Sequence, residues 1–185
     1  MMRAGQGRPD VAQPAQRDPL IRAAGGFAIV SGIISAVGVV FLIALYVLLF
    51  ATPFQALGLT FGMLNDICVA IQYLLTIPIA VALHRILLPH NPRRIRVATT
   101  IGISMMIVVI ALQMLLVFGL VTFQQQAVWV SLALFLGVGS WMVITGSVAR
   151  STGRLPNGAR MSWVGATYFG YPVWAVWLGR RLLGW

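Results

Sequence analysis

Charged side chains are scarce in this sequence. Only 9% of its 185 residues are charged, whereas 59% are hydrophobic. A soluble domain has roughly 25% charged residues, and a soluble chain of this length lacks the core volume to bury so much apolar surface. The scarcity of charge therefore excludes an ordinary soluble domain and predicts an integral membrane protein.

Lysine is absent and acidic residues are few. The chain has three acidic residues and 13 basic ones, all of them arginine, for a formal net charge of +10. Proteins that bind nucleic acid through basic residues carry this charge on one polar face. Here the arginines lie between apolar runs instead, as in the loops of membrane proteins. We therefore expect no nucleic-acid partner.

Cysteine and the signatures of catalysis are also missing or rare. The single cysteine, Cys68, excludes an internal disulfide and is expected to be a small buried hydrophobic residue. His84 and His90 lie near each other, but their loop offers no Cys, Asp or Glu for a metal site or for acid–base catalysis. The sequence predicts no cofactor and no enzymatic activity. A lipid-modifying enzyme at the arginine-rich loops stays open as a minor alternative.

Long apolar runs fill most of the chain. A membrane-spanning helix needs about 20 apolar residues, and the runs at 24–50, 60–87, 97–121 and 127–148 are long enough. The run at 161–178 is shorter and contains Pro172. We predict an all-α integral membrane bundle over residues 23–185, with about five transmembrane helices, or four if the last segment is re-entrant. Residues 1–22 are polar and are predicted to form a disordered cytoplasmic tail.

The arginines gather in alternate connections between the apolar runs. The tail and the segments after the second and fourth runs hold Arg3, Arg8, Arg17, Arg22, Arg85, Arg93, Arg94, Arg96, Arg150, Arg154 and Arg160. The positive-inside rule places these segments, and the N-terminus, on the cytoplasmic side of the cell (inner) membrane. Arg180 and Arg181 conflict with a fifth crossing, which would put them outside. A re-entrant or interfacial last segment removes the conflict.

Basic loops at the cytoplasmic face suit anionic lipid headgroups. We expect such contacts from Arg85, Arg93, Arg94, Arg96, Arg150, Arg154 and Arg160. The first apolar run also carries small residues at helical spacing: Ala28, Gly32 and Ala36. A small-residue face lets helices approach closely in lipid. Packing within the bundle is the favoured interpretation, and a homo-oligomer or another membrane-protein partner stays open.

Four polar residues inside the apolar runs form a candidate intramembrane cluster: Asn65, Asp66, Gln72 and Gln113. Asp66 is the only acidic residue in any run, and an ionisable group within a membrane is a functional hypothesis by default. If the second helix begins near Asn65, Asp66 is instead a first-turn carboxylate with Asn65 as its N-cap. For the cluster as a whole, interhelical hydrogen bonds are the favoured alternative to a functional cavity.

Aromatic residues gather near the end of the chain, as Trp163, Tyr168, Tyr171, Trp174, Trp177 and Trp185. Tryptophan and tyrosine prefer the interfaces between membrane and water. We therefore expect these residues to anchor both ends of the last segment at such interfaces.

The last quarter of the chain also carries a recognisable pattern. Glycines at 137, 139 and 146 precede Arg150-Ser151-Thr152-Gly153-Arg154-Leu155-Pro156, and the chain then ends with Gly170-Tyr171-Pro172-Val173-Trp174-Ala175-Val176-Trp177-Leu178-Gly179-Arg180 before its last five residues. This pattern resembles the C-terminal part of an uncharacterised family of small bacterial multi-pass membrane proteins, a domain of unknown function. The resemblance implies a helical membrane fold whose final segment belongs to the bundle. It implies no activity, ligand or catalytic residue.

Two functions remain after these exclusions. The first is a non-enzymatic accessory subunit or assembly factor, because ionisable groups are scarce and no soluble domain is evident. The alternative is a small transporter, channel component or proton-coupled sensor that uses Asp66 with the polar residues near it.

Overall fold

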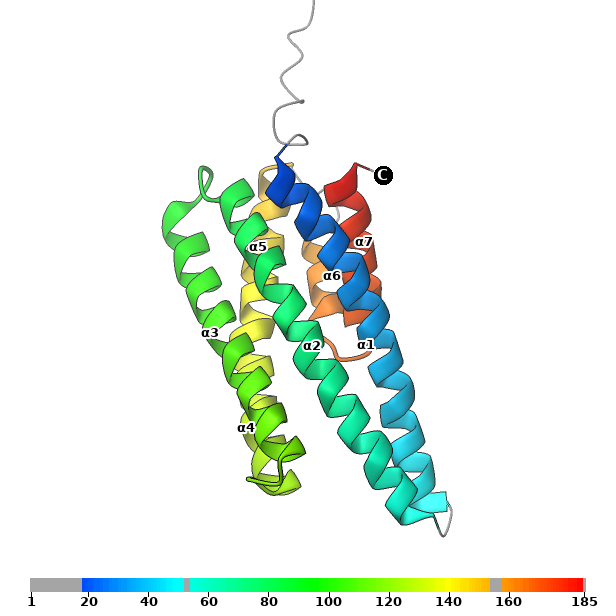
Figure 1. The fold of residues 1–185 in the computed structure, drawn as a ribbon. Coiled ribbons are helices and arrows are strands. Elements are labelled where there is room, and N and C mark those ends of the chain that lie inside the picture. The colour runs from blue at the N-terminus through cyan, green and yellow to red at the C-terminus, as the bar shows by residue number, and fades with distance from the viewer. Residues whose placement is uncertain (1–17, 52–53, 154–157, 185) are drawn as a thin grey trace, which may run out of the picture.

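The computed structural model describes residues 18–51, 54–153 and 158–184. Within these residues every regular element is helical (Figure 1). They are α1 (Pro19–Ala51), α2 (Gln55–Leu87), α3 (Pro92–Val117), α4 (Phe123–Leu132), η2 (Ala133–Gly139), α5 (Ser140–Ser151), α6 (Gly158–Gly165) and α7 (Tyr171–Leu183). Because α4, η2 and α5 form one continuous rod, four helices are long and apolar enough to cross a membrane. The prediction of an all-α membrane bundle is confirmed.

Helix α1 begins earlier than its apolar run. The Asp18 carboxylate accepts a hydrogen bond from the backbone N–H of Leu20 at 2.9 Å, which satisfies one of the unpaired donors of the first turn. Pro19 follows, in a position where its missing N–H has no cost. The predicted tail boundary at residue 22 was therefore wrong, since residues 19–22 belong to the helix. Residues 1–17 lie outside the described part.

Helix α3 also begins before its apolar run. The Asn91 side chain accepts a hydrogen bond from the Arg94 N–H at 3.3 Å, and Pro92 starts the helix. Arg93, Arg94 and Arg96 thus lie in the first two turns of α3. The sequence-based prediction that they belong to a loop was wrong. Their side chains are exposed.

The last apolar run does not cross the bundle. Helix α6 runs inward, a turn at residues 166–170 reverses the chain, and α7 returns to end beside the start of α1 (Figure 1). A Cβ atom added to Gly25 would lie 2.8 Å from Leu183, and one added to Gly32 would lie 2.9 Å from Val176, so α1 and α7 are antiparallel. We call α6, the turn and α7 the hairpin. The fifth spanning helix was wrong: the described residues contain four helices long and apolar enough to cross a membrane, and a last segment that turns back, which is the re-entrant alternative.

All arginines with described side chains are exposed at one end of the bundle, which we call the arginine end. They are Arg22, Arg85, Arg93, Arg94, Arg96, Arg150, Arg180 and Arg181. Because the hairpin returns α7 to this end, Arg180 and Arg181 no longer conflict with the others. Arg154 lies outside the described residues, as do Arg3, Arg8 and Arg17, and Arg160 belongs to α6 without a described side chain.

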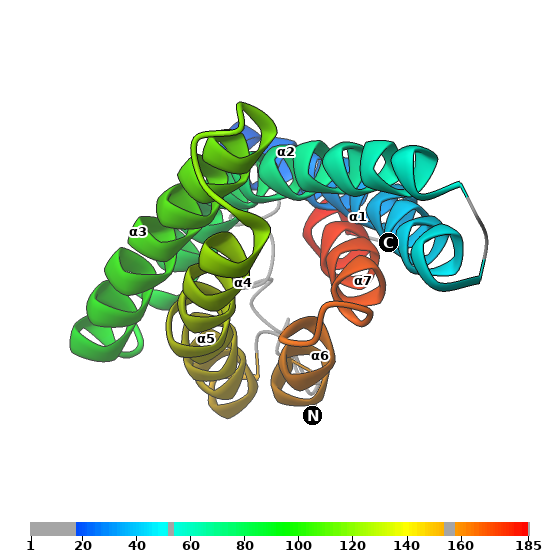
Figure 2. The same cartoon turned by 90° about the horizontal axis from the view of Figure 1, so that it is seen from below.

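The long helices spread apart away from the arginine end. Figures 1 and 2 show that α1 and α2 diverge from α3 and α4 toward the opposite, arginine-poor end. The hairpin packs against α1 and α5 and extends only partway along them. The bundle is therefore closed in its arginine-end half and open in its arginine-poor half.

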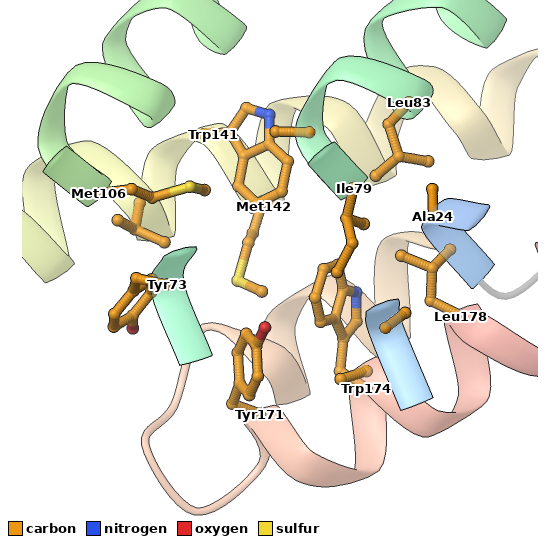
Figure 3. Close-up of a cluster of buried hydrophobic side chains, with 14 of the residues drawn as sticks. Ala24, Tyr73, Ile79, Leu83, Met106, Trp141, Met142, Tyr171, Trp174 and Leu178 are labelled. Carbon is orange, nitrogen blue, oxygen red and sulfur yellow. The ribbon is translucent and has the colours of Figure 1, made fainter. Parts of the chain in front are cut away.

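The main hydrophobic core lies around the hairpin in the closed half (Figure 3). Tyr171 and Trp174 are only 2% and 3% exposed, and the rings of Trp141 and Trp174 meet edge to face at 6.2 Å. The prediction of interfacial anchoring was wrong for Tyr171 and Trp174, because the hairpin folds back into the bundle and buries them. Trp163, on α6, is exposed.

Candidate intramembrane polar site

Asp66 lies well inside α2. The helix begins at Gln55, eleven residues earlier, which places Asp66 roughly 16 Å along an axis that rises about 1.5 Å per residue. Packing on α1 explains the early start, because a Cβ atom on Gly58 would lie 3.3 Å from the Leu48 Cβ. Asn65 is not the N-cap of α2. The interpretation of Asp66 as a first-turn carboxylate was therefore wrong.

Three elements meet at Asn65. The Tyr168 hydroxyl, from the turn of the hairpin, donates a hydrogen bond to the Asn65 Oδ1 at 2.5 Å. The Asn65 side chain also lies within hydrogen-bonding reach of the Asp66 carboxylate. From α1, a Cβ atom on Gly38 would lie 3.2 Å from the Cys68 Cβ and 3.5 Å from the Asn65 Oδ1. We call Asn65, Asp66 and Tyr168 the polar node.

A second set of hydrogen bonds lies two turns further along α2. The Tyr171 hydroxyl is 2.6 Å from the Ser31 Oγ and 2.5 Å from the Thr76 Oγ1. The Thr76 hydroxyl lies 2.7 Å from the Gln72 carbonyl oxygen, and Ser31 donates to the same oxygen at 3.3 Å. The Tyr171 hydroxyl therefore fastens the hairpin to both α1 and α2 within the core.

We call α1 with α2 one arm of the bundle and α3 with α4 the other, because the two pairs diverge toward the arginine-poor end. Gln113 belongs to the second arm. Its side-chain oxygen accepts a hydrogen bond from the Gln126 amide, which links α3 to α4. Asn65, Asp66 and Gln72 lie on α2, which diverges from α3 in this half (Figure 2). The structure thus keeps three of the candidate residues near the hairpin and separates Gln113 from them.

Sequence reasoning did not assign Tyr168 and Tyr171 to the site. Their position among other aromatic residues resembles an interfacial belt, and only the reversal at residues 166–170 brings them against α2. Thr76 was missed because a single threonine in an apolar run carries no distinguishing signal. Gln126 was missed because it lies in the expected loop, whereas the capping box of Thr122 and Gln125 extends α4 to include it.

A cavity of about 40 Å³ lies between α2, η2 and the hairpin. Its polar lining comes from Gln72, Thr167, Tyr168 and Tyr171. One buried water needs about 10–15 Å³ and two to four polar partners. The cavity therefore has the volume and the polar groups to hold water next to the polar node.

The turn of the hairpin is exposed although it lies about midway along the length of the long helices (Figure 1). Ala166, Thr167 and Phe169 are all exposed, and the turn faces the arginine-poor half. Irregular backbone at membrane depth is tolerated only where protein covers it or where it lines a water-filled cavity. Either water or a covering protein is therefore required to satisfy the exposed backbone of the turn and the polar node beside it.

Asp66 lies far from every arginine whose side chain is described. Every arginine with a described side chain lies at the arginine end, whereas Asp66 lies in the arginine-poor half. Its nearest polar neighbour is Asn65, and no arginine with a described side chain lies in its half of the bundle. Among residues 18–51, 54–153 and 158–184, no group of three or more His, Cys, Asp or Glu side chains could bind a metal ion.

No protein-family model, curated protein or solved structure matches this chain. The resemblance of the last quarter to an uncharacterised bacterial membrane family therefore stays a prediction.

Proposed function

We propose that the chain is a small, non-enzymatic, proton-linked protein of the cell membrane, either a transporter, a channel component or a sensor, with Asp66 as its titrating group. The observation that carries the proposal is the hydrogen bond from Tyr168, in the turn of the hairpin, to Asn65, the neighbour of Asp66 on α2. An intramembrane carboxylate is costly and is kept mainly where it serves a function. Here it lies beside the one exposed irregular turn found at membrane depth in the described residues.

Water reaching the polar node from the arginine-poor end is the central requirement of this proposal. Cys68, the single cysteine, lies two residues from Asp66 and next to Gly38, and it is partly exposed. A membrane-impermeant maleimide reacts only with a thiol that water reaches, because the thiolate is the nucleophile. In oriented proteoliposomes, we expect Cys68 to react with maleimide added at the arginine-poor side and not with maleimide added at the arginine end.

Asp66→Asn tests the role of the carboxylate itself. In proteoliposomes with an imposed pH gradient, we expect the wild-type chain to carry a proton flux or to change its intrinsic fluorescence with pH. Asp66→Asn should lose both responses and keep its yield and helix content. The matched control is Asp18→Asn, which removes a carboxylate that only caps α1. Unchanged responses in Asp66→Asn, or an equal loss in Asp18→Asn, would count against the proposal.

The orientation belongs to the same proposal. The positive-inside rule puts the arginine end in the cytoplasm, together with both ends of the chain. Its arginines would then contact anionic headgroups of the cytoplasmic leaflet. Fluorescent-protein fusions at the N-terminus and at the C-terminus should both fluoresce in intact cells. A dark C-terminal fusion beside a bright N-terminal one would indicate an odd number of crossings and overturn this orientation.

The divergence of the two arms favours a second candidate, a non-enzymatic accessory subunit or assembly factor. Protein instead of water would then cover the turn at residues 166–170. Purification in a mild detergent distinguishes the two candidates. A stoichiometric membrane-protein partner that blocks maleimide labelling of Cys68 would support the accessory subunit, whereas an uncovered, labelled chain would support the proton-linked protein.

A further inference from the structure

We propose that the closed half holds a binding site for one buried water molecule, at which α5 is bridged to the hairpin. The site is formed by the indole nitrogen of Trp141, the hydroxyl of Thr145 and the hydroxyl of Ser162. It is separate from the polar node and does not depend on the proposed function.

Two buried polar atoms carry this inference. The Trp141 Nε1 and the Thr145 Oγ1 have no hydrogen-bond partner among the residues that the structure describes. Trp141 is 0% exposed and Thr145 is 5% exposed, so neither side chain reaches bulk water or headgroups. A buried polar group without a partner costs about 1–3 kcal/mol. Two such groups one helical turn apart therefore point to a ligand that satisfies both.

Both residues line the same cavity. Its volume is about 10 Å³, and its lining includes Trp141, Thr145 and Ser162, with Trp174 and Trp177 of α7. This volume is at the lower limit for one water molecule and excludes a larger ligand. The site is also closely packed on its α3 side, because a Cβ atom on Gly102 would lie 2.6 Å from the Trp141 Cγ.

The donor and acceptor inventory fits water. The indole N–H of Trp141 is a donor only, so its partner must accept. The hydroxyls of Thr145 and Ser162 each donate and accept. A water molecule that accepts from Trp141 and donates to these two hydroxyls makes three hydrogen bonds, which is typical of buried water.

The water site lies where the hairpin meets α5. Ser162 belongs to α6, and Trp174 and Trp177 of α7 close the cavity, so the water lies between α5 and both helices of the hairpin. Movement of the hairpin away from α5 would therefore open the site to solvent.

Nuclear magnetic resonance of the full chain in detergent micelles tests the site, with the tryptophan indole nitrogens labelled by ¹⁵N. The indole signal that disappears in Trp141→Phe is assigned to Trp141. Should this variant fail to fold, single replacements of the other tryptophans assign the signal by elimination. We expect a nuclear Overhauser cross-peak between the Trp141 indole proton and water. Its sign should be that of a water molecule that stays bound to the protein for a long time.

Two substitutions at Thr145 separate bound water from proton exchange through the threonine hydroxyl. Thr145→Val keeps the volume of the cavity and two water partners, so the cross-peak should weaken but persist. Thr145→Leu fills the cavity and should abolish it. Thr60→Leu is the control, since the exposed Thr60 hydroxyl only bonds the Ala56 carbonyl of its own helix. Absence of the cross-peak in the wild type, or its complete loss in Thr145→Val, would overturn the proposal.

Discussion

The two halves of the bundle bury their helices to very different degrees. In the arginine-end half, the hairpin fills the space between α1, α2 and α5, and glycines let the backbones approach closely. In the arginine-poor half the arms diverge, and large apolar side chains such as Phe50, Phe118 and Phe135 are mostly exposed. The same four long apolar helices of the described residues run through both halves. Hydrophobicity therefore indicates which residues enter the membrane but not which of them contact other helices.

The difference teaches what holds a helix bundle together in lipid. Lipid tails are as apolar as leucine, so helices associate through close packing and interhelical hydrogen bonds rather than through hydrophobicity. The closed half has both, in the glycine contacts between α1 and α7 and in the hydrogen bonds of Tyr171. In the open half, the hydrogen bond between Gln113 and Gln126 joins α3 to α4, two helices of the same arm. Substitutions that weaken each type of contact measure the contrast.

Gly179→Ala should have the largest effect. A Cβ atom at this position would lie 2.6 Å from the Ile29 Cγ1 and 2.7 Å from the Gly25 carbonyl oxygen, so α7 must move away from α1. Overpacking of this kind costs about 1–3 kcal/mol, which exceeds the helix propensity gained by alanine. We expect the free energy of unfolding to fall by about 2 kcal/mol in a denaturing-detergent titration.

Gly26→Ala is the matched control for that substitution. Gly26 lies one residue from Gly25 in the same helix, yet a Cβ atom there would meet nothing within 4 Å. We expect this variant to be as stable as the wild type or up to about 1 kcal/mol more stable, through helix propensity alone. Equal destabilisation by Gly26→Ala and Gly179→Ala would contradict a closed half held by close backbone contacts.

Tyr171→Phe should have an intermediate effect. It removes the hydroxyl that bonds Ser31 and Thr76 but keeps the ring that packs on Trp174 at 5.4 Å. Interhelical hydrogen bonds in membranes contribute about 0.6 kcal/mol on average and at most about 1.7 kcal/mol. With two such bonds, we expect a loss of about 1–2 kcal/mol in the free energy of unfolding. Tyr46→Phe, at a tyrosine that is 48% exposed in the open half, should change it by less than about 0.5 kcal/mol.

The helical spans were largely predictable from the sequence, but their ends were not. Apolar runs of about 20 residues indicate spanning helices directly. The capping residues Asp18, Asn91 and Thr122 shift three helix starts outward by several residues, and a hydropathy pattern does not weigh single capping hydrogen bonds. The start of α2 at Gln55 depends on tertiary packing against α1, which no local pattern contains.

The hairpin and the site were only partly predictable. Pro172, Arg180 and Arg181 indicated that the last segment is unusual, and re-entry was one of the predicted outcomes. The contacts of Tyr168 with Asn65 and of Tyr171 with Thr76 span 103 and 95 residues of sequence. Such contacts arise only once the hairpin has folded back against α2. The depth of Asp66 along α2 could not be predicted either, because it depends on where α2 begins.

The pair of Gln113 and Gln126 gives the smallest expected effect and the most direct measure of the open half. The two side chains are buried and joined by one hydrogen bond between α3 and α4. We expect a coupling energy of about 0.6 kcal/mol from the double-mutant cycle of Gln113→Leu and Gln126→Leu. The free energy of unfolding, measured in the same titration, gives each corner of the cycle.

The double variant separates this hydrogen bond from a functional role for either glutamine. Each single leucine leaves one buried amide without its partner, whereas the double replacement leaves none and should recover part of the lost stability. Because the pair joins α3 and α4 within one arm, its removal should leave the hairpin and the maleimide labelling of Cys68 unchanged. A coupling energy as large as the whole effect of Tyr171→Phe would show that one hydrogen bond contributes as much in the open half as in the closed half. Altered labelling of Cys68 would show that this pair is coupled to the polar node in the other arm.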